Sequence, residues 1–134
     1  MKLYLDMDGT IADLYGQENW LPKLRNEDKQ VFKECQPLIT ETQLLNDIKK
    51  IFKEDIEIVI LSMTPKDASK EYCEQVKQQK NEWLDKFFPN LTKRIYRPYG
   101  HNKNLKNSSN AILIDDSEPI RKNYKGIALA PWWC

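Results

Sequence analysis

The first ten residues place the strongest constraint on how this chain can fold. Residues 2–5 form a short run of strand-forming side chains, and Asp6, Asp8, Gly9 and Thr10 follow at once. A strand that ends in acids delivers their carboxylates to its carboxyl end, where open α/β sheets bind their ligands. Gly9 permits a sharp turn or a close approach of the backbone to a ligand. The opening therefore predicts a buried strand that leads directly into a functional site.

The two acids predict a cation at this site. In a strictly extended segment Asp6 and Asp8 would share one face, because strand side chains alternate. Two carboxylates so close together repel each other unless a cation or a shared proton relieves them. Magnesium takes hard oxygen ligands of this kind, often together with phosphate. A hairpin turn is the simpler alternative for Asp-x-Asp-Gly. A calcium loop fails, because its twelfth position, counted from Asp6, is Gln17 and not an acid.

Length and charge narrow the class of protein. The chain of 134 residues suits a single domain, 1–134, with a core of its own. A formal net charge of +1 gives no indication of a nucleic-acid or membrane partner. Three scattered cysteines predict reduced thiols rather than a disulfide or metal framework. An acid as early as Asp6 is not expected in the apolar core of a signal peptide. No run of apolar residues is long enough to span a membrane. We expect a cytoplasmic protein.

The rest of the chain alternates helices with strands. Residues 14–39 are irregular, with one or two short helices, and form what we call the flap segment. Thr40 and Gln43 make a capping-box pattern before a helix that reaches about residue 53. Asp67 is expected to cap a long helix that ends at Pro89. The other predicted elements are strands 56–61, 94–96, 111–114 and 126–130, and a helix over 117–124.

This alternation predicts an α/β fold with a parallel sheet and right-handed crossovers. We expect about five strands with helices on both faces, and the first strand between strands 56–61 and 111–114. Because parallel strands end at one edge, the acids after the first strand would meet Ser62, Asp115 and Asp116 in one crevice. That convergence is the main argument for catalysis. The tail residues Trp132 and Trp133 are expected to cover the sheet edge.

Four short motifs in this order resemble the haloacid dehalogenase (HAD) superfamily of phosphotransferases. They are Asp6-Met7-Asp8-Gly9-Thr10, Ile60-Leu61-Ser62, Lys103 and Ile114-Asp115-Asp116. The resemblance spans residues 2 to about 120. It implies a three-layer Rossmann-like fold with a minimal cap and a magnesium-dependent phosphatase.

The resemblance also implies a role for each site residue. Asp6 would be the nucleophile that forms an aspartyl-phosphate, and Asp8 would protonate the leaving oxygen and later deprotonate water. Magnesium would be held by Asp6, by the backbone carbonyl of Asp8 and by Asp116, with Asp115 as the supporting acid. Ser62 would donate a hydrogen bond to phosphate. Backbone N–H groups near Met63 and Met7 could do the same.

One lysine is needed to offset the negative charge of the nucleophile and the phosphoryl oxygens. Lys103 is our first choice for this catalytic and phosphate-binding role, with Lys106 and Lys80 as alternatives. His101 lies in the same polar loop, and we assign it no role.

Within the superfamily the chain looks most like the 5'(3')-deoxyribonucleotidase-type branch. The shared features are residues 6–13, the Lys80-x-x-Trp83-Leu84 pattern and residues 113–116. They imply nucleoside monophosphates as substrates. The residues expected to line the substrate pocket are Leu14, Tyr15 and Trp20.

Other substrates and one non-enzymatic function stay open. The flap segment is short, so the crevice is expected to be open enough for a polynucleotide end or a phosphoprotein. A sugar phosphate or another small phosphomonoester is the next alternative to a nucleotide. The low net charge argues against a polynucleotide, whose binding depends on clustered lysine and arginine. A non-catalytic protein that binds a partner in the same crevice is the competing class.

Overall fold

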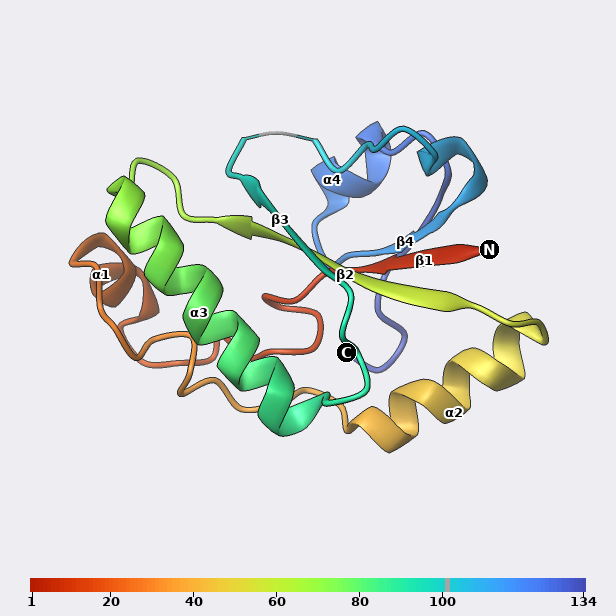
Figure 1. Ribbon diagram of the computed structural model, residues 1–134, viewed down its shortest axis with the longest axis horizontal. Coiled ribbons are helices and arrows are strands. Elements are labelled where there is room, and N and C mark those ends of the chain that lie inside the picture. Colours follow the sequence, from red (N-terminus) through yellow and green to blue (C-terminus); the bar gives the residue numbers. More distant parts are fainter. Residues whose placement is uncertain (101) are drawn as a thin grey trace.

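The structure is a computed structural model that describes residues 1–100 and 102–134. It contains a five-stranded sheet in which every neighbouring pair of strands is parallel, in the order β3-β2-β1-β4-β5 (Figure 1). The first strand is central, as the sequence predicted, and the whole arrangement fits a Rossmann-like α/β fold. The strands are β1 (Lys2–Leu5), β2 (Glu57–Thr64), β3 (Arg94–Pro98), β4 (Ile112–Ile114) and β5 (Ile127–Leu129).

In the part of the chain that the structure describes, four α-helices connect or flank these strands. The helix predicted after Thr40 is present, and the Thr40 side chain accepts a hydrogen bond from the Gln43 N–H at 3.2 Å, as an N-cap should. The helices are α1 (Trp20–Arg25), α2 (Glu41–Phe52), α3 (Lys70–Phe87) and α4 (Glu118–Asn123), and a 3₁₀ turn covers Ser108–Asn110.

Apolar side chains are buried on both faces of the sheet. In β1, Leu3 and Leu5 belong to the larger hydrophobic cluster, which also contains buried residues of α2 and α3. Tyr4 points to the opposite face and joins a smaller cluster with Tyr124 and the α4 residue Ile120. Figure 1 shows α2 and α3 on one side of the sheet and α4 on the other. Because side chains alternate along β1, this short strand contributes to both hydrophobic clusters.

Two predicted boundaries are wrong. Strand β2 continues past Leu61 to Thr64, because its last residues pair with β3, including Ser62 with Tyr96. Helix α3 is capped by Ser69, whose side chain accepts a hydrogen bond from the Tyr72 N–H at 3.1 Å. Asp67 has a φ of 55°, outside the extended conformation that an N-cap residue requires. The N-cap of α3 is therefore Ser69, two residues after the predicted cap Asp67.

The flap segment is built into the core. Phe32 and Cys35 are buried, and α3 holds the backbone around them through side-chain hydrogen bonds. The Trp83 Nε1–H donates to the Cys35 carbonyl at 2.7 Å, and the Gln79 side chain accepts from the Phe32 N–H at 3.0 Å. The segment contains one short helix, α1. These bonds attach residues 32–35 to α3.

Among the described residues, no helix combines the length and the apolar character needed to cross a bilayer. His101, to which the sequence assigned no role, lies outside the described residues.

Candidate active site

A cleft of about 850 Å³ opens at the carboxyl ends of the central strands. Its lining includes Asp6 and Asp8, which follow β1, and Asp115 and Asp116, which follow β4. This is the position at which open parallel sheets bind ligands, and the volume is in the range of small-molecule sites. The sequence correctly predicted that these four acids would meet.

Lys103 lies between two of the acids at the bottom of the cleft. Its Nζ donates to Asp6 Oδ1 at 2.6 Å and to Asp115 Oδ2 at 2.7 Å. Burial alone would lower the pKa of this ammonium, but the two carboxylates outweigh burial and raise the pKa above its usual value. Burial likewise acts to raise the pKa of Asp6, but the Lys103 charge prevails and lowers it. Asp6 is therefore an ionised carboxylate. Lys106 is exposed.

Asp116 joins the two carboxylates that contact Lys103. Oxygens of Asp6, Asp115 and Asp116 lie within 4.8 Å of one another. Burial and repulsion by Asp6 raise the pKa of Asp115 to about 6. Burial and the contact with Asp6 raise the pKa of Asp116 to about 8. One lysine does not neutralise this cluster, and a set of hard carboxylate oxygens fits a divalent cation such as magnesium.

Thr10 and Gly9 orient these acids. The Thr10 hydroxyl donates to Asp6 Oδ2 at 2.8 Å and accepts from the Asp116 N–H at 3.2 Å. Gly9 has a φ of +79°, and a Cβ there would lie 2.3 Å from Asp116 Oδ2. The Trp133 Nε1–H donates to the Thr10 carbonyl at 2.7 Å, so this tail residue contacts the site loop. The sequence flagged Thr10 only as part of a motif and did not assign it this role.

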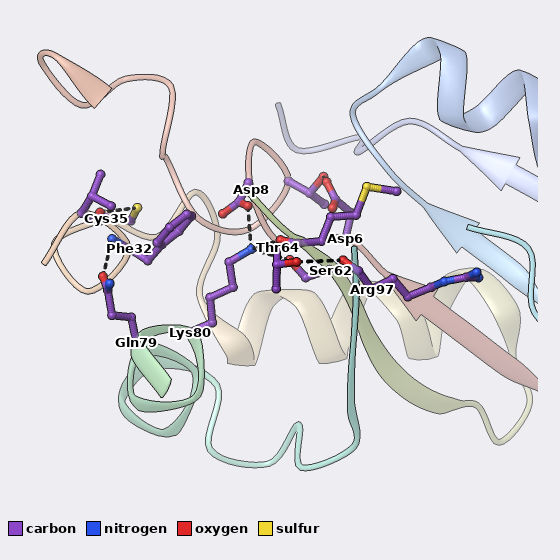
Figure 2. Close-up of polar contacts among 12 residues, drawn as sticks. Asp6, Asp8, Phe32, Cys35, Ser62, Thr64, Gln79, Lys80 and Arg97 are labelled. Atoms are coloured by element: carbon purple, nitrogen blue, oxygen red, sulfur yellow. Dashed lines mark hydrogen bonds and ion pairs between the residues drawn. The ribbon is translucent and has the colours of Figure 1, made fainter. Parts of the chain in front are cut away.

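Lys80, the last of the three candidates for the catalytic lysine, binds Asp8, the second acid of the opening motif. Its Nζ donates to Asp8 Oδ2 at 2.9 Å, to Ser62 Oγ at 2.8 Å and to the Met63 carbonyl at 2.9 Å. The side chain is fully buried, and its ammonium lies 4.7 Å from the centre of the Phe32 ring. Figure 2 shows it reaching from α3 to Asp8 and the end of β2. Each acid of the Asp-x-Asp pair therefore has its own lysine.

The two acids diverge because regular strand structure ends at Leu5, before either of them. The Asp6 carboxylate contacts Lys103, whereas the Asp8 carboxylate contacts Lys80. The two carboxylates therefore do not share a binding partner, as they would on one face of a regular strand. Asp8 Oδ1 is buried and has no hydrogen-bond partner among the described residues. This oxygen is covered by neighbouring atoms, so it is unpaired without being exposed to the cleft.

The predicted phosphate-binding residues Ser62 and Met63 lie at different depths relative to the surface of the cleft. Ser62 is fully buried, accepts from Lys80 and lies beneath the surface of the cleft, whereas Met63 and Thr64 line it. Direct contact of Ser62 or of the Met63 N–H with phosphate stays a prediction. The burial of Ser62 follows from the extension of β2 beyond Leu61.

The predicted substrate-pocket residues Leu14, Tyr15 and Trp20 all line the cleft. Tyr15 is 51 % exposed, and its ring meets Trp20 edge-on with ring centres 4.9 Å apart. Burial, together with repulsion from Asp8, raises the pKa of the Tyr15 phenol, which therefore stays protonated. Sequence reasoning missed other lining residues, because nothing local marks them: Arg25, Glu27, Phe32, Lys66 and Tyr99.

No protein-family model matches this chain, and a search of curated proteins finds no significant match.

Proposed function

We propose that this protein is a magnesium-dependent phosphomonoester hydrolase of the HAD type, with the three-layer fold of that superfamily and Asp6 as its nucleophile. The observation that supports it most is the cluster of Asp6, Asp115 and Asp116 in the cleft, in which Asp6 and Asp115 contact buried Lys103. A carboxylate can attack phosphorus only where the negative charge of phosphate is offset. Lys103 supplies part of that charge, and the excess of carboxylates over lysine calls for a cation.

Magnesium would be held by the carboxylates of Asp6 and Asp116 and by the backbone carbonyl of Asp8. Asp115 is better suited to a supporting role, because its two oxygens already accept from Lys103 and from the Ser117 N–H. When bound, the ion would draw charge from the phosphoryl oxygens and align phosphorus with the nucleophile.

The chain's own residues would carry the bond changes. An Asp6 oxygen attacks phosphorus, the ester P–O bond breaks, and the leaving oxygen takes a proton from Asp8. Water then attacks the aspartyl-phosphate, gives a proton to Asp8, and releases phosphate as the bond to Asp6 breaks. Lys80 would hold Asp8 in place through Oδ2 during both steps.

Nucleoside monophosphates are the proposed substrates. The wall of the cleft also carries two aromatic rings, Tyr15 and Trp20, and the apolar side chains Leu14, Leu21 and Leu24. A nucleobase could pack against these rings while its phosphate reaches Asp6. A simple sugar phosphate would leave this apolar wall unused.

We expect purified protein with magnesium to release phosphate from deoxyribonucleoside monophosphates faster than from phosphosugars, phosphopeptides or an aryl phosphate. Phosphate release by each member of the panel, with and without excess chelator, is the measurement. If nucleotides rank no higher than the aryl phosphate, the nucleotidase assignment fails. If no substrate is hydrolysed in the presence of magnesium, the non-catalytic binding protein becomes the better hypothesis.

The acid cluster also predicts how stability depends on pH and metal. In the metal-free protein the pKa of Asp116 is about 8 and that of Asp115 about 6, both above the ordinary 3.8. The folded state then binds more protons than the unfolded state between about pH 4 and pH 8, so stability should fall as pH rises through this window. The lowered pKa of Asp6 and the raised pKa of Lys103 give contributions that stay constant between pH 6 and pH 8.

Because magnesium displaces the proton of Asp116, its stabilising effect should be larger at pH 8 than at pH 6. The measurement is the melting temperature at both pH values, with and without magnesium. Asp116→Asn should remove most of the magnesium effect and flatten the metal-free pH dependence. A magnesium shift that is equal at the two pH values would contradict the proposed ligand set.

A further inference from the structure

A second groove, of about 570 Å³, continues from the cleft. The two share lining residues, among them Thr64, Lys66 and Tyr99, so one ligand can occupy both. The groove lies between the loop that joins β2 to α3, the first two turns of α3 and the end of β3. Strand β3 is the edge of the sheet farthest from β4 and β5 in the strand order, and Figure 1 shows these segments together at that edge. It is separate from the acid cluster and has no role in the hydrolysis derived above.

The lining of this groove is strongly basic. Lys66, Lys70, Lys77 and Arg97 line it, against a single acid, Asp67. Of the four basic residues, only Lys77 forms an ion pair with a carboxylate of the described chain, a surface contact with Glu74 at 3.1 Å. The Arg97 guanidinium donates from Nη1 to the Asn104 carbonyl at 2.8 Å, on the face of β3 opposite Tyr96 and α3, so the positive charge on the α3 side comes from the three lysines. Positive charge is therefore concentrated here, although the whole chain is almost neutral.

Aromatic rings accompany this charge. Tyr99 is 57 % exposed and lines both the groove and the cleft. Tyr96 lines the groove, and its hydroxyl donates to Asn81 Oδ1 at 2.6 Å, which fixes the ring. Cations that neutralise phosphates, interleaved with rings on which bases can stack, are the features with which proteins bind single-stranded nucleic acid.

We propose that this basic groove (Lys66, Lys70, Lys77, Arg97, Tyr96 and Tyr99) binds the nucleotides next to a terminal phosphate in the cleft, so that single-stranded oligonucleotide ends are substrates of the same site as nucleoside monophosphates. The proposal rests on the proposed function, because the terminal phosphate is placed at Asp6. A phosphopeptide fits less well, since it brings no second phosphate to the lysines beyond the cleft and no bases to the tyrosines.

The test uses single-stranded DNA of about six nucleotides, a length that covers one short binding site, with a phosphate at the 5' or the 3' end. Binding is measured by fluorescence anisotropy in excess chelator. Lys70→Gln with Lys77→Gln removes two charges that line only the groove. We expect this double variant to bind the DNA at least about tenfold more weakly and to show a smaller salt dependence. Its turnover of nucleoside monophosphates should not change.

Lys49→Gln with Lys50→Gln on α2 makes the same change in net charge away from the groove and should bind DNA like the unmodified protein. Equal affinity of the two double variants, or tighter binding of a phosphopeptide than of DNA, would overturn the proposal. Phosphate release tests the proposed function, and DNA binding in chelator tests the groove, so the two claims can fail separately. If no phosphate is released from any substrate but the Lys70/Lys77 change still weakens DNA binding, the proposed function fails and the groove assignment stands.

Discussion

Asparagine in place of Asp6 is expected to abolish phosphate release, by a factor on the order of 10³ or more, while the protein stays folded. The amide has nearly the same size as the carboxylate but cannot act as the nucleophile. Lys103 keeps one ionised partner, Asp115, and the crowding of carboxylates is relieved. Phosphate release in magnesium and the thermal unfolding of Asp6→Asn measure the two effects separately.

Asp55→Asn is the matched control, because Asp55 is exposed in the loop before β2, far from the cleft lining. It should retain full activity. Substantial turnover by Asp6→Asn would refute the aspartyl-phosphate mechanism. A large loss of stability in that variant would instead show that the Asp6–Lys103 pair holds the fold together.

Methionine in place of Lys80 is expected to destabilise the protein by about 3–5 kcal/mol, the range found when one partner of a buried ion pair is removed. Lys80 is fully buried, and its ammonium satisfies Asp8, Ser62 and the Met63 carbonyl at once. Methionine fills much of the same space but leaves the Asp8 carboxylate without its cation. Urea unfolding measures the loss, and activity should fall with it, since Asp8 is no longer held.

Two comparisons isolate the ion pair. Lys77→Met, on the same helix, removes an exposed pair with Glu74 and should cost less than about 1 kcal/mol. The double variant Asp8→Asn with Lys80→Met should be destabilised by clearly less than the sum of the single changes, because it leaves no unpaired buried charge. Strict additivity would show that the Lys80 effect comes from packing alone.

The basic groove shows how an average over the sequence can conceal a local feature. A net charge of +1 argued against a polynucleotide substrate, yet Lys66, Lys70, Lys77 and Arg97 line one groove. Lys66, Lys70 and Lys77 come from the loop and the helix that follow β2, whereas Arg97 comes from β3. The pairing of β2 with β3 places Arg97 beside them.

The sequence by itself determined the fold class, the central place of β1 and the four acids of the site. These rest on local patterns: apolar runs of strand length, alternation with helices, and acids placed directly after strands. Because parallel strands end at one edge, residues after β1 and after β4 had to meet whatever the details of packing. The choice of Lys103 rests on the family resemblance, which places a lysine before the last acids, and its loop begins at the carboxyl end of β3.

The tertiary structure alone decided the second lysine, the role of Thr10 and the attachment of the flap segment. Lys80 lies 72 residues from Asp8 along the chain, and Trp83 lies 48 from Cys35. Neither contact leaves a periodic signal, because a buried lysine in a helix and a surface lysine look alike until the helix is docked. Sequence periodicity reports which face of an element is buried, whereas the partner of a buried polar group depends on how the elements pack together.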